Sequence, residues 1–439
     1  MGIGNRYGRN LSGVKRNLSR VFLILVIIII GTYSVPLILL SEEVNFEKKI
    51  FNVGLKLLDF EYVNPSGKKE IITTAIWYPS ETSPVKYIYH VRKDFESKVV
   101  FDVPLAKNEG HYPLIIFSHG GYSCGYASAF FMEYLARHGY IVVAPDYKDT
   151  KSPDYTEQIA FDRIKGGNVG HPLQVLRVAG QFVKDMEVDR QSCVAYMEKQ
   201  RLNPTAFILD KMIKLNSDKD SFLYQSIKED AIGMCGHSLG GLTTIGKIGA
   251  HPDKRFKDVR IKAALIFSGS VYPFENTVGN IDIPIMLMTG DNDESELGGG
   301  LNIRRRLLYD KANSPKFYLI LKNATHFAFS NTVCGETPLY QAVEVNPQAK
   351  AICEYGLAFF EKYFRGLASA DEKLKKLDSA WAYYIKEENP GEKFELGKEP
   401  PPGTGVKEAI RNELGGGRGR ESKGRRGRGE WLRRWRQEE

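Results

Sequence analysis

Seven short apolar runs between residues 70 and 323 constrain the fold more than any other feature of the sequence. They are rich in β-branched residues and bounded by turn residues, which is typical of strands. Several have no polar face, so both faces of those strands must be buried. Helical patterns such as Ala127–His138 and Leu239–Ala250 lie between them, which predicts a largely parallel sheet with helices on both faces. The runs are EIITTAIWY from Glu70, YPLIIFSH from Tyr112, YIVVAPD from Tyr140, DAIGMCG from Asp230, IKAALIFSG from Ile261, IPIMLMTG from Ile283 and KFYLILKN from Lys316.

An eighth strand is expected near Gly54–Tyr62, because the turn NPSGKK joins it to the run at Glu70 and predicts an antiparallel edge. The fold class is therefore α/β, with a mostly parallel eight-stranded sheet. Between the fourth and fifth strands, residues 148–229 are too long for an ordinary connection. We expect a helical insertion that acts as a cap or lid, although ordinary packing helices would give the same pattern. Its helical patterns lie at His171–Glu187, Ala195–Lys199 and Ile208–Leu215.

The first 40 residues differ in composition from the rest of the chain. Residues 1–20 carry five basic and no acidic side chains, and residues 21–40 form an apolar stretch as long as a bilayer crossing requires. Because basic flanks stay in the cytoplasm, this predicts a transmembrane signal anchor that holds residues 41–397 on the extracytoplasmic side. The alternative is a cleaved signal peptide and a secreted protein, because the run VFLILVIIII has the length of an h-region.

The other end of the chain, residues 398–439, combines glycine and arginine without a periodic apolar face, which predicts a disordered basic tail. The two ends account for the basic character of the chain. The formal net charge is +8, and residues 1–20 and 398–439 each carry a net charge of +5. The domain between them is therefore close to neutral, and we expect no nucleic-acid partner.

Five cysteines are scattered along the chain without the CxxC spacing of metal and redox sites. A domain of this size does not need disulfides for its stability, so buried thiols are expected. A bridge between Cys334 and Cys353 is the alternative.

The segment Gly236–Gly240 has the sequence GHSLG and matches the pattern GxSxG. It follows the predicted strand at Asp230 and opens a predicted helix, which is the context that this motif requires. A sharp turn between strand and helix raises a serine hydroxyl above the sheet and leaves no room for side chains beside it. The pattern therefore predicts Ser238 as a nucleophile, with the backbone N–H of Leu239 available to bind an oxyanion.

A serine hydroxyl needs a base, and in this architecture the chain order is serine, then acid, then histidine. Only His251 and His326 follow Ser238, and His251 closes the nucleophile's own helix, far from the hydroxyl at its start. His326 lies on a loop after the last strand and is the predicted base. The acid is expected after the preceding strand, where Asp291 and Asp293 compete. We favour Asp293, because a residue farther along the loop can reach the imidazole.

The loop after the run at Tyr112 is expected to supply the second oxyanion donor. Gly120 and Gly121 allow the backbone to turn its N–H groups inward, so the hole is assigned to the N–H of Gly121 together with that of Leu239. Tyr122 is expected to line the substrate pocket or to pack on its rim, and His119 to hydrogen-bond its own loop. No metal or organic cofactor is expected, because base activation and oxyanion binding cover the chemistry.

Taken together, these motifs resemble the α/β-hydrolases, and among them the branch of platelet-activating factor acetylhydrolases and dienelactone hydrolases. The motifs are WYPS, FSHGG, RHGYIVVAPDY, GHSLGG, TGDND and THFAF, in this order over about residues 70–365. The resemblance implies an α/β-hydrolase fold and hydrolysis of short-chain or phospholipid-like acyl esters, as in lipid degradation. The chain is also similar to bacterial polyester-cleaving esterases around Asp293 and His326. Ser238 stands where true dienelactone hydrolases have cysteine, so their activity is not expected.

The sequence thus predicts a membrane-anchored serine esterase that acts through Ser238, Asp293 and His326 and an acyl-enzyme. Its expected partners are a small-molecule or lipid ester and the membrane that holds the anchor. A serine peptidase or amidase would use the same three residues. A binding protein with an inactive triad is an alternative of a different class.

Overall fold

The computed structural model describes residues 49–91, 93–107, 111–121, 123–147, 190–293, 301–376 and 378–400. Several predictions fall outside these residues: the basic N-terminus 1–20, the apolar stretch 21–40, the helical pattern His171–Glu187, and all of the predicted basic tail beyond Pro400.

Within the described residues, twelve strands form one sheet in the order β12-β11-β10-β9-β8-β7-β5-β6-β2-β1-β4-β3. Their bounds are β1 Asn52–Val63, β2 Lys69–Ser80, β3 Val85–His90, β4 Asp94–Phe101, β5 Tyr112–Ser118, β6 Ile141–Pro145, β7 Ile227–His237, β8 Ile261–Phe267, β9 Ile285–Gly290, β10 Lys316–Leu321, β11 Trp381–Asn389 and β12 Glu392–Gly397.

The centre of the sheet is parallel, as the apolar runs predict. Within the series β6-β5-β7-β8-β9-β10, each strand pairs in parallel with the next one. Every residue of β5, β6 and β9 is buried. Alternate residues of β5 enter different cores: Ile115 and Phe117 pack on one face, and Leu114 and Ile116 on the other. Both faces of the sheet are therefore covered.

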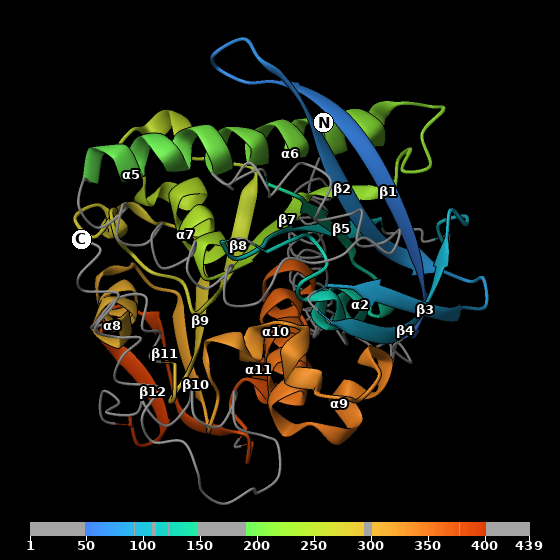
Figure 1. Ribbon diagram of the computed structural model, residues 1–439. Helices are drawn as coiled ribbons and strands as arrows, with labels where there is room; N and C mark the ends of the chain where they lie inside the picture. Colours follow the sequence, from blue (N-terminus) through green and yellow to red (C-terminus); the bar gives the residue numbers. More distant parts are fainter. Residues whose placement is uncertain are drawn as a thin grey trace, which may run out of the picture. The chain divides into compact units, whose positions relative to one another are not determined.

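Helices α2 Ala129–Arg137 and α10 Pro347–Arg365 contribute to one core, and α6 Asn203–Ser217, α7 Leu239–Ile245 and α8 Leu301–Lys311 to the other (Figure 1). Several other helices and helical turns are present among the described residues. They are α5 Arg190–Met197, α9 Ala342–Val345, α11 Ala368–Lys373, the π-helical turns η2 Glu198–Leu202 and η3 Gly246–Ala250, and the 3₁₀ turns η4 Lys254–Phe256, η5 Val278–Asn280, η6 His326–Phe329, η7 Asn331–Cys334 and η8 Leu339–Gln341.

The predicted eight-stranded sheet is wrong in size, because the sequence patterns miss β3, β4, β11 and β12 at its two ends. Strand β4, with the sequence DFESKVVF, and β12, with EKFELG, alternate charged and apolar residues and bury only part of each strand. Such strands lack the continuous apolar run that marks a central strand. The sheet is also more antiparallel than predicted: β2 pairs antiparallel with both β1 and β6, and β11 with both β10 and β12.

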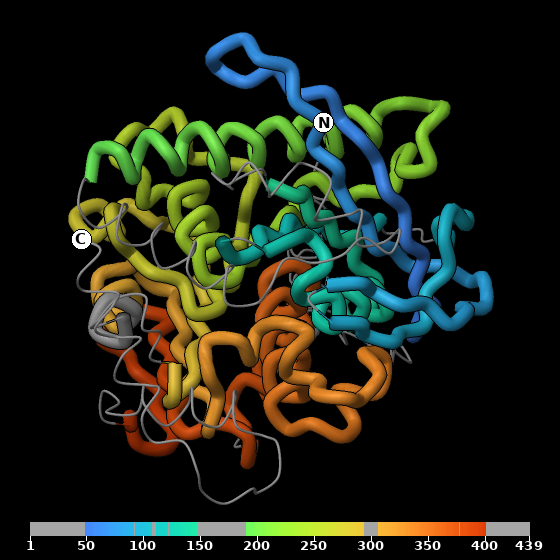
Figure 2. Tube along the Cα trace, viewed as in Figure 1, coloured from blue at the N-terminus to red at the C-terminus, as the bar shows by residue number. Residues whose placement is uncertain are grey.

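The predicted hairpin of β1 and β2 does form, but β4 and β3 lie beyond it, so it is not the edge of the sheet. Its turn is held by Asn64, whose side-chain oxygen accepts hydrogen bonds from the backbone N–H groups of Ser66 and Lys68, each at 3.0 Å. The hairpin extends beyond the neighbouring strands at this turn (Figure 2).

The helices of the structure do not support the predicted membrane anchor, and this prediction is corrected. Among the described residues, no helix has both the length and the hydropathy that a bilayer crossing requires. An apolar stretch indicates a transmembrane span only where it forms one continuous helix of about 20 residues. The stretch 21–40, on which the prediction was based, lies outside the described residues.

The described part of the insertion is helical from Arg190 to Ser217. Helix α5, the π-helical turn η2 and helix α6 follow one another without a break and form one long helix (Figure 1). This helix includes the predicted helical patterns at Ala195–Lys199 and Ile208–Leu215.

Candidate active site

Ser238 lies at the sharp turn between β7 and α7. Its backbone has φ 56° and ψ −116°, a conformation that non-glycine residues rarely adopt. The Ser238 N–H donates a hydrogen bond to the carbonyl of Phe267 at 2.9 Å, which ties the turn to the end of the neighbouring strand β8. Strained backbone of this kind persists only where the surrounding structure holds it in place, and it is common at catalytic residues.

The glycines of the motif are required by close backbone contacts. A Cβ atom on Gly236 would lie 2.2 Å from the carbonyl oxygen of Gly240. A Cβ atom on Gly240 would lie 1.8 Å from the carbonyl oxygen of Ser118. Both distances are far shorter than any normal contact, so the turn cannot form with larger residues at these positions. This is the physical reason for the GxSxG pattern that the sequence displays.

His326 and Asp293 are in direct contact. The Nδ1 atom of His326 lies 2.9 Å from Oδ1 of Asp293, and the Asp293 side chain is completely buried. The two residues follow β10 and β9, which are parallel neighbours, so both loops leave the same end of the sheet. The hydroxyl of Thr325 accepts a hydrogen bond from the Phe327 N–H and starts the turn η6 that carries His326.

The loop of His326 packs against the residue that precedes Ser238. The Nε2 atom of His237 lies 2.8 Å from the carbonyl oxygen of His326 and donates a hydrogen bond to it. The two imidazole rings are 4.8 Å apart between centroids. The structure therefore brings the last histidine of the chain to the turn that carries the serine.

Asp291, the competing acid, has a different environment. Its backbone N–H donates to the carbonyl of Leu321 at 3.0 Å. Burial raises the pKa of the Asp291 carboxyl, while hydrogen bonds from the backbone N–H groups of Ala324 and Asn323 lower it. Asp291 thus contacts the backbone of the turn after β10, and the hydrogen bond to the imidazole comes from Asp293.

The glycines after β5 lie against the same turn. A Cβ atom placed on Gly120 would be 3.4 Å from Cβ of Ser238, and one on Gly121 would be 3.5 Å from Cδ2 of Leu239. The two residues predicted to form an oxyanion hole, Gly121 and Leu239, are therefore neighbours. Tyr122, the predicted pocket residue, lies outside the described residues.

Arg201 is a residue of this region that the sequence patterns do not identify. It belongs to the turn η2 of the insertion and is completely buried. Its guanidinium donates hydrogen bonds to the carbonyl oxygens of His119 at 2.7 Å and Gly120 at 3.2 Å. No motif marks an arginine in a helix as a partner of a loop some eighty residues earlier in the chain, so the sequence offers no signal for it.

Asn331 connects the loop of His326 to the start of α2. Its side-chain oxygen accepts a hydrogen bond from the Phe130 N–H at 3.2 Å, and its side-chain nitrogen donates to the Tyr126 carbonyl at 2.9 Å. Its backbone N–H donates to the carbonyl of Ala127 at 2.7 Å. These contacts fix the position of the histidine loop relative to the segment that follows Gly121.

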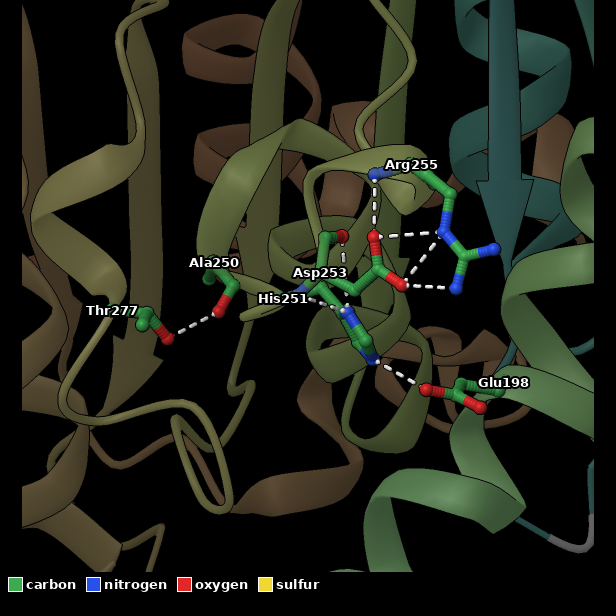
Figure 3. A network of polar contacts seen from close by, with 6 residues as sticks. All are labelled: Glu198, Ala250, His251, Asp253, Arg255 and Thr277. Atoms are coloured by element: carbon green, nitrogen blue, oxygen red, sulfur yellow. Dashed lines mark hydrogen bonds and ion pairs between the residues drawn. The ribbon is translucent and has the colours of Figure 1, made fainter.

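His251, the other histidine after Ser238, has a separate set of contacts at the end of the turn η3 (Figure 3). Its Nδ1 atom accepts a hydrogen bond from the Asp253 N–H at 3.0 Å, and its Nε2 atom lies 3.1 Å from Oε1 of Glu198. The ring also packs against Phe256, with centroids 4.3 Å apart. His251 therefore joins the insertion helix to the far end of the helix that follows Ser238.

All five cysteines lie among the described residues and are buried thiols, as predicted, so Cys334 and Cys353 do not form a disulfide. Within the described part of the chain, no group of three or more His, Cys, Asp or Glu side chains is arranged to hold a metal ion.

A comparison with known protein families finds a match in the first half of the chain. Residues 85–165 match the family model described as Chlorophyllase. This range includes β5, α2, β6 and the loop of Gly120 and Gly121, and it ends before Ser238. No curated protein sequence matches the chain.

Proposed function

We propose that the chain is a serine esterase, because residues 85–165 match the model of a family that belongs to the α/β-hydrolase superfamily. The match supports ester hydrolysis at a coarse level. The nucleophile is Ser238, the base is His326, and the acid that orients the base is Asp293. The substrates are short-chain or phospholipid-like acyl esters, as the resemblance of the motifs to the platelet-activating factor acetylhydrolase branch implies.

In the acylation step, the Ser238 hydroxyl attacks the ester carbonyl carbon and its proton moves to Nε2 of His326. The oxygen of the carbonyl becomes an oxyanion, which accepts hydrogen bonds from the N–H groups of Gly121 and Leu239. Asp293 holds the imidazole through Nδ1 and stabilises the imidazolium. When the intermediate collapses, the alcohol leaves with the proton from His326.

In the deacylation step, a water molecule attacks the acyl-enzyme and gives its proton to His326. The carboxylic acid leaves, and the Ser238 oxygen recovers the proton. His326 therefore takes up and releases the proton in both steps, and the backbone N–H groups stabilise the oxyanion.

The observation that carries this proposal is the contact between Asp293 and His326, 2.9 Å apart, on a loop that packs on the residue before Ser238. The experiment is a Ser238→Ala variant of the full chain, assayed with p-nitrophenyl acetate and with a fluorophosphonate probe. We expect turnover to fall by roughly 10³-fold or more and labelling to disappear. An unchanged esterase rate in the variant would contradict the proposal.

Two further results would favour the alternatives. Faster cleavage of an anilide than of the matched ester would indicate a peptidase or amidase. Absence of labelling in folded wild-type protein would indicate a binding protein. A series of p-nitrophenyl esters from acetate to palmitate then defines the acyl length, and the proposal expects the short chains to react fastest.

A further inference from the structure

Arg201 holds the loop that contains the proposed oxyanion donor Gly121. The guanidinium donates one hydrogen bond to the His119 carbonyl and another to the Gly120 carbonyl, at 2.7 and 3.2 Å. The side chain is completely buried, and its charged group lies over the ring of Tyr147, 4.5 Å from the centroid. A buried charge is stable only with partners of this kind, so the arginine and the loop carbonyls depend on each other.

The Gly120 carbonyl has a second donor in the same loop. Nδ1 of His119 lies 2.7 Å from the Gly120 oxygen, and Nε2 of His119 accepts a hydrogen bond from the Tyr147 N–H at 3.0 Å. Because a carbonyl oxygen can only accept a hydrogen bond, Nδ1 of His119 carries a proton and donates it to Gly120. The Gly120 oxygen thus receives hydrogen bonds from the His119 ring, from the Arg201 guanidinium and, at 3.3 Å, from the backbone N–H of Ser123.

This arrangement determines where the Gly121 N–H points. In a trans peptide the carbonyl and the following N–H point in opposite directions. Fixing the Gly120 oxygen therefore fixes the N–H of Gly121 on the other side of the same plane. Two consecutive glycines have no side chains to restrict their backbone, so an external anchor is needed.

We propose that Arg201 is a positioning residue for ester hydrolysis: it directs the Gly121 N–H toward the oxyanion and strengthens it as a donor. A positive charge on the carbonyl of a peptide polarises that peptide and makes its N–H a better hydrogen-bond donor. The effect is largest in the transition state, when negative charge develops on the substrate oxygen. This inference rests on the proposed function, because it assigns the Gly121 N–H to the oxyanion.

The insertion helix holds Arg201 in place. The Thr205 hydroxyl lies 2.7 Å from the Arg201 carbonyl oxygen and also 2.7 Å from the Tyr147 hydroxyl. Three residues before Arg201, Glu198 contacts His251 at the end of the nucleophile's helix (Figure 3). Isolated π-helical turns such as η2 are frequent at functional sites. The insertion is therefore fastened both to the oxyanion loop and to the helix that follows Ser238.

The test compares Arg201→Lys and Arg201→Met in the full chain. Lysine keeps the charge but cannot reach both carbonyls as a planar fork, whereas methionine keeps much of the stem and removes the charge. We expect kcat with p-nitrophenyl acetate to fall by about 10- to 100-fold, less than the loss of a whole oxyanion donor, and KM to change by less than about 3-fold. Lysine should retain more activity than methionine.

A short-chain trifluoromethyl ketone separates positioning from a general structural effect, because it forms a tetrahedral oxyanion on the serine. Its inhibition constant should rise in proportion to the fall in kcat/KM. Arg190→Met is the matched control, because Arg190 lies on the same long helix and its guanidinium donates to the Pro273 carbonyl and to Glu275. This control should keep its activity within about 2-fold.

Two outcomes overturn the proposal. If the Arg201→Lys protein folds and binds the trifluoromethyl ketone as tightly as wild type, Arg201 does not position the donor. If folded wild-type protein is not labelled by the fluorophosphonate probe, the proposed function and this inference both fail. If the probe labels the wild type but the Arg201 variants keep wild-type kcat and inhibition constant, only the inference about Arg201 fails and the proposed function stands. If Arg201→Met does not fold, Arg201→Lys alone decides, with circular dichroism as the check on its fold.

Discussion

The carboxylate of Asp293 lies 2.9 Å from Nδ1 of His326 and is shielded completely from solvent. A buried carboxylate is costly unless it is hydrogen-bonded, so this contact fixes both the orientation and the tautomer of the imidazole. With Nδ1 donating to Asp293, Nε2 is left as the atom that can accept a proton. The position of one buried acid thus decides which ring nitrogen is available for chemistry.

Asp293→Asn tests the assignment of the acid directly. An asparagine can present its NH2 group to Nδ1, which favours the wrong tautomer, so we expect kcat to fall by about 10³- to 10⁴-fold. Asp291→Asn is the matched control, because its carboxyl contacts the backbone of the turn and burial already raises its pKa. In the Asp291→Asn variant, kcat should fall by less than about 10-fold. The assignment is wrong if Asp291→Asn is the inactive variant and Asp293→Asn is active with p-nitrophenyl acetate.

Gly240→Ala tests the close packing under the serine turn. Its Cβ atom would lie 1.8 Å from the carbonyl oxygen of Ser118, a backbone atom that cannot move without shifting β5. We expect a loss of more than about 3 kcal/mol in the free energy of unfolding, or failure to fold. The control is Gly67→Ala in the β1–β2 turn, where φ is +80° but no atom lies within 4 Å of the added Cβ. That variant should lose about 1–2 kcal/mol in urea denaturation. Equal losses in the two variants would show that the contact with Ser118 does not matter.

The site residues that can be predicted from the sequence are those whose position follows from local context. Ser238, Asp293 and His326 each lie within five residues of the end of an apolar strand, so the parallel order of the strands brings their loops to one end of the sheet. The glycines around Ser238 are also visible in the sequence, because each is required by a contact within the turn or with the adjacent strand. Strand order and turn chemistry are therefore sufficient to place these residues.

Arg201 could not be found in the same way. Its role depends on how the insertion helix lies against the loop of His119 and Gly120, and no local pattern encodes that contact. The strands β4 and β12 were missed for a related reason, because their mixture of charged and apolar residues forms a strand only where a sheet edge pairs with it. The features that the sequence did not predict are those that depend on long-range packing, which local sequence patterns do not encode.

Glu133 gives the chain a specific pH dependence of stability. It is buried in helix α2, and its carboxyl accepts a hydrogen bond from the Ser97 hydroxyl at 2.5 Å. Burial raises the pKa of Glu133 to about 7, although hydrogen bonds from Ser97 and Tyr89 lower it. The folded protein therefore keeps this proton over a pH range in which the unfolded chain has lost it. Stability should fall as pH rises from about 4.5 to about 7 and then become constant for this group.

Glu133→Gln removes that titration and keeps the shape of the side chain. Wild type should lose of order 1–3 kcal/mol of unfolding free energy between pH 5 and pH 8 relative to the variant. Urea denaturation of both proteins across this range measures the difference. Glu96→Gln is the control, because the half-exposed Glu96 side chain on β4 forms an ion pair with Lys86, and this variant should keep the wild-type pH dependence. If the unfolding free energy of wild type and of Glu133→Gln changes with pH in the same way, Glu133 does not cause the pH dependence.

Asn331 holds the loop of His326 against the start of α2, so its loss should lower both the stability of the protein and kcat. Its side chain is buried and bonds both the Phe130 N–H and the Tyr126 carbonyl, so Asn331→Ala leaves two buried polar groups without this partner. Losing such bonds lowers the free energy of unfolding by about 1–3 kcal/mol. It also leaves the loop of His326 less firmly held against α2. We expect a lower melting temperature together with a lower kcat. Asn389→Ala, which removes an exposed contact with Glu392, should change neither quantity. A variant at Asn331 that melts earlier but keeps its full kcat would mean that the histidine loop is positioned by its other contacts, chiefly the bond from His237 to the His326 carbonyl.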